Sequence, residues 1–239
     1  MNQDAQLLAK HVAKVHKFFL PVLAFLLVFS LGLSQWHDTL MVSLIVALPA
    51  AIIPTILIFM APQALITRLT VGVALMVFSG LNIHQAQGMT EFHFGVFVLM
   101  SLLLFYRDWR VIVLAAFLIV VHHVSFNYLQ EAGINAIGFT KTGLDIVLIH
   151  IAYVVIEAGT LSYLAVFLRR EMVTIALSGS TFKTRFDTMQ TMIERTRSGI
   201  EAINTSSKEI AVGNANLSTR TEAQASSLEE TASTMEQLT

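Results

Sequence analysis

The chain has 239 residues, of which 55% are hydrophobic and only 13% are charged, and its mean hydropathy is +0.68. This composition excludes an ordinary soluble domain and indicates that the bilayer is the solvent for much of the chain. Cysteine is absent, which excludes disulfides and thiolate metal ligands. The net charge of −1 hides an asymmetry, because the sequence turns polar from position 171 onward.

Six apolar stretches follow a polar N-terminal segment, residues 1–17. A hydrocarbon core of about 30 Å needs roughly 20 apolar residues per helix. The stretches cover about 18–35, 40–60, 65–86, 91–106, 110–130 and 143–168, and the fourth is the shortest. We therefore expect an all-α membrane protein in which residues 18–170 form a six-transmembrane-helix bundle.

The basic residues predict how this bundle is oriented. If the six helices alternate in direction, nearly all lysines and arginines near the helix ends lie on one side, and the opposite side has only Lys141. The basic side is cytoplasmic by the positive-inside rule. Both termini are then cytoplasmic, and we expect a multi-pass protein of the bacterial inner membrane. The basic residues are Lys10, Lys14, Lys17, Arg68, Arg107, Arg110, Arg169 and Arg170.

Five of the eight histidines fall in the outer half of this predicted bundle, on four different helices. They are His84, His93, His122, His123 and His150. At 1.5 Å per residue the last three lie roughly 11 Å below the outer surface, and the other two roughly 5 Å shallower. Adjacent helical residues point about 100° apart, so at most one of His122 and His123 is expected to be a direct ligand.

Several neighbouring residues are candidates to support these histidines. Glu91 and Glu157 are possible carboxylate partners, since ionisable groups inside the membrane usually face the bundle interior and find a partner. Asn127 and Tyr153 are placed to orient an imidazole, and Met89 offers a soft sulfur ligand for Cu(I). A plainer interpretation is that each histidine only joins helices through hydrogen bonds.

The shared depth of the histidines favours a metal or metallocofactor, and two metal interpretations compete. A bare copper ion suits several imidazoles close to the outer surface, and we prefer it. A haem b would need two histidines on facing helices with small residues beside them. A third interpretation is a pocket for a small hydrophobic or quinone-like molecule, without metal.

Beyond the last span, residues 171–190 read as a linker and residues 191–239 as a polar helix with apolar residues at heptad-like spacing. This narrow seam is typical of a coiled coil. Its members are Met192, Ile193, Ile200, Ile203, Ile210, Leu217, Leu228, Met235 and Leu238. We expect a cytoplasmic coiled-coil helix.

The stretch "IAVGNANLSTRTEAQASSLEETASTMEQLT", residues 210–239, resembles the start of the signalling domain of methyl-accepting chemotaxis proteins. In that family the second residue of a Glu/Gln pair is methylated. The resemblance implies that Glu230 in "EETAST" is a methyl acceptor and that Gln237 in "MEQLT" becomes one after deamidation. The equivalent place one site earlier holds Ala223, so that site looks lost.

The same resemblance implies a chemoreceptor rather than an enzyme. It implies a homodimer joined through the coiled coil, with a chemotaxis kinase, a coupling protein, a methyltransferase and a methylesterase as partners, and no nucleic acid. The chain departs from the common plan of the family in three ways. It has no large outer domain, it has too few residues after the last span for the usual linker domain, and it stops before the kinase-binding tip. We therefore expect the last span to act on the output helix almost directly, through a hinge near Gly179.

Overall fold

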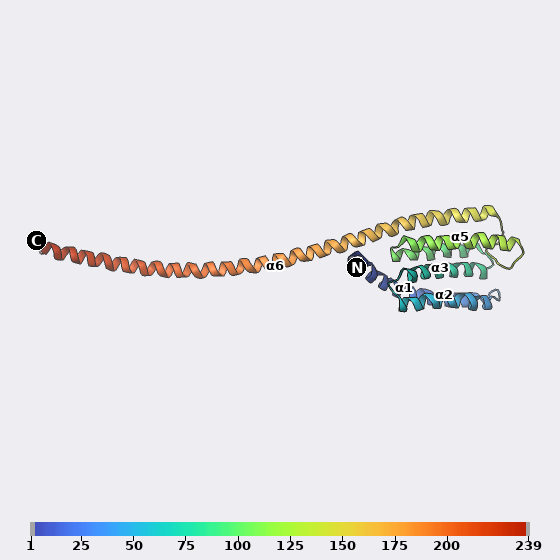
Figure 1. Ribbon diagram of the computed structural model, residues 1–239, viewed down its shortest axis with the longest axis horizontal. Helices are drawn as coiled ribbons and strands as arrows, with labels where there is room; N and C mark the ends of the chain where they lie inside the picture. The colour runs from blue at the N-terminus through green and yellow to red at the C-terminus, as the bar shows by residue number, and fades with distance from the viewer. Residues whose placement is uncertain (1–2, 238–239) are drawn as a thin grey trace. The chain divides into compact units, whose positions relative to one another are not determined.

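The computed structural model describes the backbone of residues 3–237 and the side chains of residues 7–235, and this part of the chain contains helices and no strand (Figure 1). The all-α expectation is confirmed. The elements are α1 (Gln3–Leu33), α2 (Leu40–Met60), α3 (Leu65–Gln85), α4 (Thr90–Leu102), the 3₁₀ helix η1 (Leu103–Tyr106), α5 (Trp109–Glu131) and α6 (Leu144–Gln237).

Five helices are long and apolar enough to cross a membrane: α1 from Leu7, then α2, α3, α5 and α6. The fourth predicted span falls short, because α4 has 13 residues before the chain tightens into η1. A 13-residue helix is only about 20 Å long, less than the thickness of a hydrocarbon core. The apolar helices are those of a membrane protein, and a sixth full span is not established.

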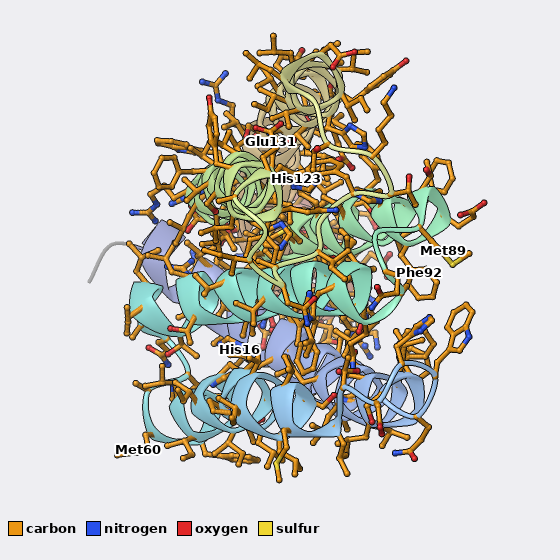
Figure 2. The ribbon with its side chains drawn as sticks, turned by 90° about the vertical axis from the view of Figure 1, so that its right-hand side faces the viewer. His16, Met60, Met89, Phe92, His123 and Glu131 are labelled. Atoms are coloured by element: carbon orange, nitrogen blue, oxygen red, sulfur yellow. The ribbon has the colours of Figure 1, made fainter. Side chains whose placement is uncertain are left out.

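The chain divides into two compact units, Met1–Ile175 and Ala176–Thr239. The first unit contains α1 to α5 and the start of α6. Within it, α3 packs against α1, α2, α4 and α5, and its side chains are the most thoroughly buried. His16 and His123 lie among the packed side chains of this unit, whereas Met60 lies at its edge (Figure 2).

Small residues let α5 approach α3 closely. A Cβ added to Gly72 would lie 2.9 Å from Cγ1 of Val111, and one added to Gly80 would lie 2.9 Å from the His122 ring. Glycine at such contacts is typical of helix packing in membranes, where van der Waals contact replaces hydrophobic driving force. These two contacts therefore set the register of α5 against α3.

The "YRDWR" turn holds a buried ion-pair cluster. Asp108, whose side chain is fully buried, caps α5 and pairs with Arg68 of α3 at 3.2 Å and with Arg110 at 2.9 Å. Burial alone would raise the pKa of the Asp108 carboxyl. The hydrogen bonds and charge of Arg110, with the charge of Arg68, outweigh burial and hold that pKa below its ordinary value. The Asp108–Arg68 ion pair therefore ties this turn to α3.

The second unit consists of the rest of α6. The helix continues without a break through residues 171–190, which we predicted as a linker, and past Gly179, our predicted hinge. Its apolar seam is exposed in the single chain: Ile193, Ile200, Ile203, Ile210 and Leu217 are each 59–68% accessible. Leu238, the last predicted seam residue, lies outside the described residues.

Candidate metal centre

Three of the five predicted histidines meet in the first unit. His93 comes from α4, His123 from α5 and His150 from α6. The ring centroids of His93 and His150 are 5.0 Å apart, those of His93 and His123 are 5.4 Å apart, and those of His123 and His150 are 5.5 Å apart. We call this set the histidine triad; it links three helices by their imidazole rings.

The three rings share one hydrogen-bonding pattern. Nδ1 of each lies near the backbone carbonyl four residues earlier: His93 at 3.1 Å from Met89, His123 at 2.8 Å from Ile119, and His150 at 2.8 Å from Ile146. A carbonyl oxygen only accepts. His93 faces a second carbonyl oxygen at Nε2, that of Gly138 at 3.1 Å, so a neutral His93 ring places its hydrogen on one nitrogen or the other. In His123 and His150, Nδ1 carries the hydrogen. In a neutral imidazole, Nε2 then holds the lone pair that a metal needs. A histidine ligand whose other nitrogen donates to a carbonyl is a common arrangement in metal sites.

The spacing of the rings matches what three imidazoles need to share one ion. With metal–nitrogen distances of about 2.0–2.1 Å and tetrahedral angles, imidazole centroids lie about 5 Å apart. As the side chains stand, however, no group of three or more His, Asp or Glu residues in the described part has the geometry to hold a metal. One reason is that Nε2 of His93 faces the carbonyl oxygen of Gly138 at 3.1 Å. Binding therefore requires the rings, His93 above all, to rotate.

Phe139 packs against the whole triad. Its buried ring lies with its centroid 5.7 Å from that of His93, 5.4 Å from that of His123 and 5.5 Å from that of His150. An aromatic ring in this position excludes water from the imidazoles and limits their rotation. The residues alone gave no reason to select Phe139, because it lies in the loop between α5 and α6 among several unremarkable residues.

Gln130 and Gly88 hold that loop in place. The Gln130 side chain donates to the Phe139 carbonyl at 2.7 Å and accepts from the backbone N–H groups of Gly138 and Phe139 at 3.0 and 3.2 Å. Gly88 has a φ of +70°, and a Cβ there would lie 2.4 Å from the carbonyl carbon of Phe139. Gly88 therefore lets the α3–α4 turn touch the backbone beside the triad. Sequence reasoning missed both residues, although a glycine in the "QAQGMTE" turn was a usable signal.

The other two predicted histidines lie outside the triad. His84, near the end of α3, accepts a hydrogen bond at Nδ1 from the backbone N–H of Ile137, at 3.1 Å. The His122 ring has its centroid 5.4 Å from that of His123, and it packs on Phe126 of its own helix with ring centroids 4.0 Å apart. Both line a separate cavity. That at most one of His122 and His123 is a direct ligand stays a prediction.

The predicted supporting residues do other things in the structure. Asn127 accepts from the backbone N–H of Gly143 at 2.9 Å and donates to Glu131 at 3.0 Å, so it fastens the α5–α6 loop rather than an imidazole. Met89 contacts His93 through its backbone carbonyl oxygen, which lies near Nδ1 of the His93 ring. The other three lie apart from the triad rings in different settings: Glu91 is exposed in the first turn of α4, Tyr153 is 62% accessible, and Oε2 of Glu157 is buried with no hydrogen-bond partner in the described part.

The predicted methylation positions lie in the second unit. Glu230 is exposed on α6, as a substrate of a modifying enzyme must be. Gln237 is the last residue of α6, and its side chain lies outside the described residues. Comparisons with known protein families, with curated sequences and with solved structures return no match. The likeness of residues 210–239 to chemoreceptors stays a prediction from the sequence.

Proposed function

We propose that this chain is the sensing part of a membrane chemoreceptor whose histidine triad binds a copper ion near the outer face of the inner membrane. It reports copper, redox or oxygen state to a cytoplasmic coiled coil. In this proposal both termini are cytoplasmic, α4 with η1 completes a six-helix bundle, and the chain is not an enzyme. The observation that carries it is the meeting of three imidazoles from α4, α5 and α6 at centroid distances of 5.0–5.5 Å.

Copper is favoured over the other metals by the donors available. A chain without cysteine offers no thiolate, and imidazole nitrogens bind copper more strongly than the other divalent first-row ions. A haem is a poorer fit to the triad. Two axial imidazoles on one haem iron lie on opposite faces of the macrocycle, with centroids about 6 Å apart on the metal distances used above. The triad rings are closer than that, and Phe139 packs against all three.

Helix α6 gives the bound ion a way to signal. His150 lies on α6, and the same helix continues to the predicted methylation site Glu230. An ion that draws His150 toward His93 and His123 favours one position of α6 against α4 and α5. A ligand shifts a conformational equilibrium only by its different affinity for the two states. Here that difference arises because the triad rings must rotate to bind.

The exposed seam of α6 supports a homodimer. Its isoleucines and leucines repeat at heptad-like spacing and are mostly accessible in the single chain. Such a stripe is stable in water when a second helix covers it. In a dimer, carboxylates such as Glu230 repel across the coiled coil, so esterification by a methyltransferase changes its packing energy. Kinase and coupling protein would read that packing, as the family resemblance implies.

Metal analysis of the purified full-length chain tests the proposal. After loading with Cu(I) or Cu(II) and desalting, we expect about one copper per chain in the wild type and a loss of most of it in His123→Ala and in His150→Ala. His37→Ala is the matched control, because His37 is exposed and outside the triad, and it is expected to retain the metal. Equal copper in all four proteins, or none in any, contradicts the proposal.

A further inference from the structure

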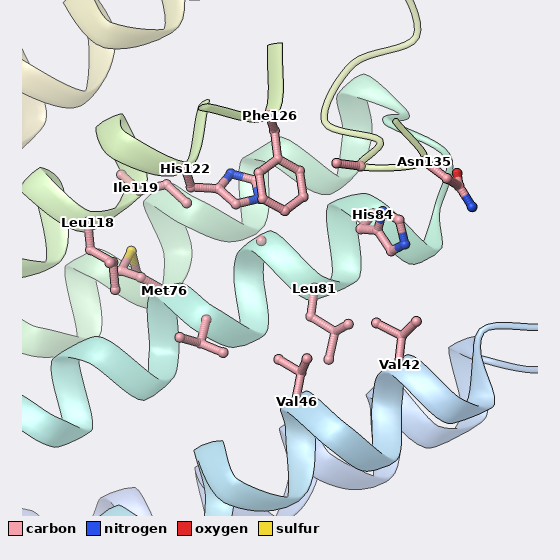
Figure 3. Close-up of a pocket in the computed structure, with 13 residues that line it drawn as sticks. Val42, Val46, Met76, Leu81, His84, Leu118, Ile119, His122, Phe126 and Asn135 are labelled. Carbon is pink, nitrogen blue, oxygen red and sulfur yellow. The ribbon is translucent and has the colours of Figure 1, made fainter. Parts of the chain in front are cut away.

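A second candidate site lies on the other side of α5, in a cavity of about 400 Å³ between α2, α3 and α5 (Figure 3). Its walls are mostly aliphatic, with Val42, Leu81 and Ile119 among them. The polar side chains in its lining are His84, His122 and Asn135. A mainly apolar cavity with a few converging polar groups is the usual form of a small-molecule site.

His122 is the lining residue whose polar atoms lack hydrogen-bond partners in the described part of the chain. Both of its ring nitrogens are buried. A buried donor or acceptor left unpaired is unfavourable, so native structures rarely leave one without a reason. The ring lies beside Phe126 (Figure 3), and it fits over α3 only because position 80 is glycine, whose added Cβ would lie 2.9 Å from Nε2 of His122.

His84 supplies a hydrogen-bond donor, and its contact with Ile137 indicates which of its two ring nitrogens that donor is. Its Nδ1 faces the backbone N–H of Ile137, which only donates, so Nδ1 is the acceptor. In the neutral ring, Nε2 therefore carries the hydrogen. The cavity thus holds one imidazole with a defined N–H donor and a second, His122, that offers one donor and one acceptor.

We propose that this cavity binds the head group of a quinone. The ligand needs a flat apolar ring to fill aliphatic walls beside Phe126, and carbonyl or hydroxyl oxygens at its edge to pair with the two imidazoles. A quinone carbonyl accepts from an imidazole N–H, and the hydroxyl of the reduced form can also donate. The helices around the cavity are apolar enough for a membrane, so such a molecule reaches the site by dissolving in the bilayer.

The two sites share α5 through its adjacent histidines. The rings of His122 and His123 lie with centroids 5.4 Å apart, one facing the cavity and the other the triad. This arrangement gives the pair of histidines in "VVHHVSFN" two separate roles. The quinone site does not depend on the proposed metal, and each can fail without the other.

Binding of 2-methyl-1,4-naphthoquinone to the purified full-length chain in detergent tests the inference, with 2-methylnaphthalene as a ligand of the same ring shape without oxygens. Equilibrium dialysis is carried out on wild type, His122→Phe and His123→Ala. His122→Phe keeps a ring of similar size but removes both nitrogens, and circular dichroism with thermal melting checks that it folds.

We expect the quinone to bind the wild type about tenfold more tightly than the hydrocarbon, since tenfold corresponds to about 1.4 kcal/mol, the upper end of the net contribution of one hydrogen bond. His122→Phe is expected to lose that preference, and His123→Ala to keep it while losing copper. Three results would overturn the inference: no quinone binding, equal binding of both ligands by the wild type, or an unchanged preference in folded His122→Phe.

Discussion

The contact between Gly88 and the backbone of Phe139 can be tested by adding a single methyl group. In Gly88→Ala the new Cβ would lie 2.4 Å from the carbonyl carbon of Phe139 and 2.7 Å from its Cα and N atoms. All three are backbone atoms, so no side-chain rotation relieves the overlap. The residue also has a φ of +70°, which costs an alanine about 1–2 kcal/mol. With overpacking of about 1–3 kcal/mol, the loss of unfolding free energy is about 2–5 kcal/mol.

Phe139 must move to accommodate this alanine, and the triad packed against it is then disturbed. We expect copper affinity, measured by competition with a chelator, to fall about tenfold or more, since tenfold corresponds to 1.4 kcal/mol. Gly133→Ala is the matched control. Gly133 has a φ of +79°, but a Cβ there meets nothing within 4 Å. It carries the backbone strain alone, about 1–2 kcal/mol, with copper affinity unchanged.

The proposed role of the contact between Gly88 and Phe139 is refuted if Gly88→Ala melts and binds copper as the wild type does. It is also refuted if Gly133→Ala weakens copper binding equally, because backbone strain in a nearby loop would then be sufficient and the contact with Phe139 would have no special role.

Two further predictions concern the ion-pair cluster and the coiled coil. Asp108→Asn leaves Arg68 as a buried charge without its partner, so we expect a loss of about 3 kcal/mol in unfolding free energy. Because the pKa of Asp108 is lowered in the folded protein, its stabilisation is present above the ordinary carboxyl pKa and is lost as pH falls through the lowered value. The acid limb of a stability–pH curve is therefore expected to be shallower in Asp108→Asn, and identical limbs would argue against this role. Ile203→Asp puts a charge in the exposed seam and is expected to weaken self-association at least tenfold in analytical ultracentrifugation of the full chain, while Thr205→Asp, off the seam, has little effect. If the two variants associate equally, the seam is not the dimer contact.

Much of the helical framework could be predicted from hydropathy. The expected spans 40–60 and 65–86 differ from α2 and α3 by at most one residue at either end, because apolar runs bounded by Gly, Pro and polar turns leave little choice in a bilayer. The fourth span was harder. Residues 91–106 are mostly apolar, but the chain changes to 3₁₀ geometry at Leu103 before the "YRDWR" turn.

The candidate site could be predicted only in part. The sequence indicates how deep in the membrane a helical residue lies, but it does not indicate toward which neighbour its side chain points. Depth follows from residue number along a helix, and it grouped His93, His123 and His150 together with His84 and His122. The direction in which each ring points depends on how the helices rotate and pack, which depth does not specify. The 100° step between His122 and His123 predicted that they separate, but only the packing of Gly80 against His122 determines which one faces the triad.

The surroundings of the triad depend on contacts between residues far apart in sequence. Phe139 reaches the imidazoles because Gln130 binds its backbone and Gly88 approaches it from the α3–α4 turn. None of these pairings leaves a periodic pattern. Asn127, one turn from His123, binds the Glu131 side chain and the backbone of Gly143, contacts that its position in the sequence did not indicate.

X-ray absorption at the copper edge of the loaded full-length chain tests the central claim most directly. We predict a first shell of about three nitrogens near 2.0 Å with the multiple scattering of imidazole, and a loss of most of this copper signal in His150→Ala. A first shell dominated by oxygen or sulfur, or a spectrum that His150→Ala leaves unchanged, would contradict a copper centre built from His93, His123 and His150.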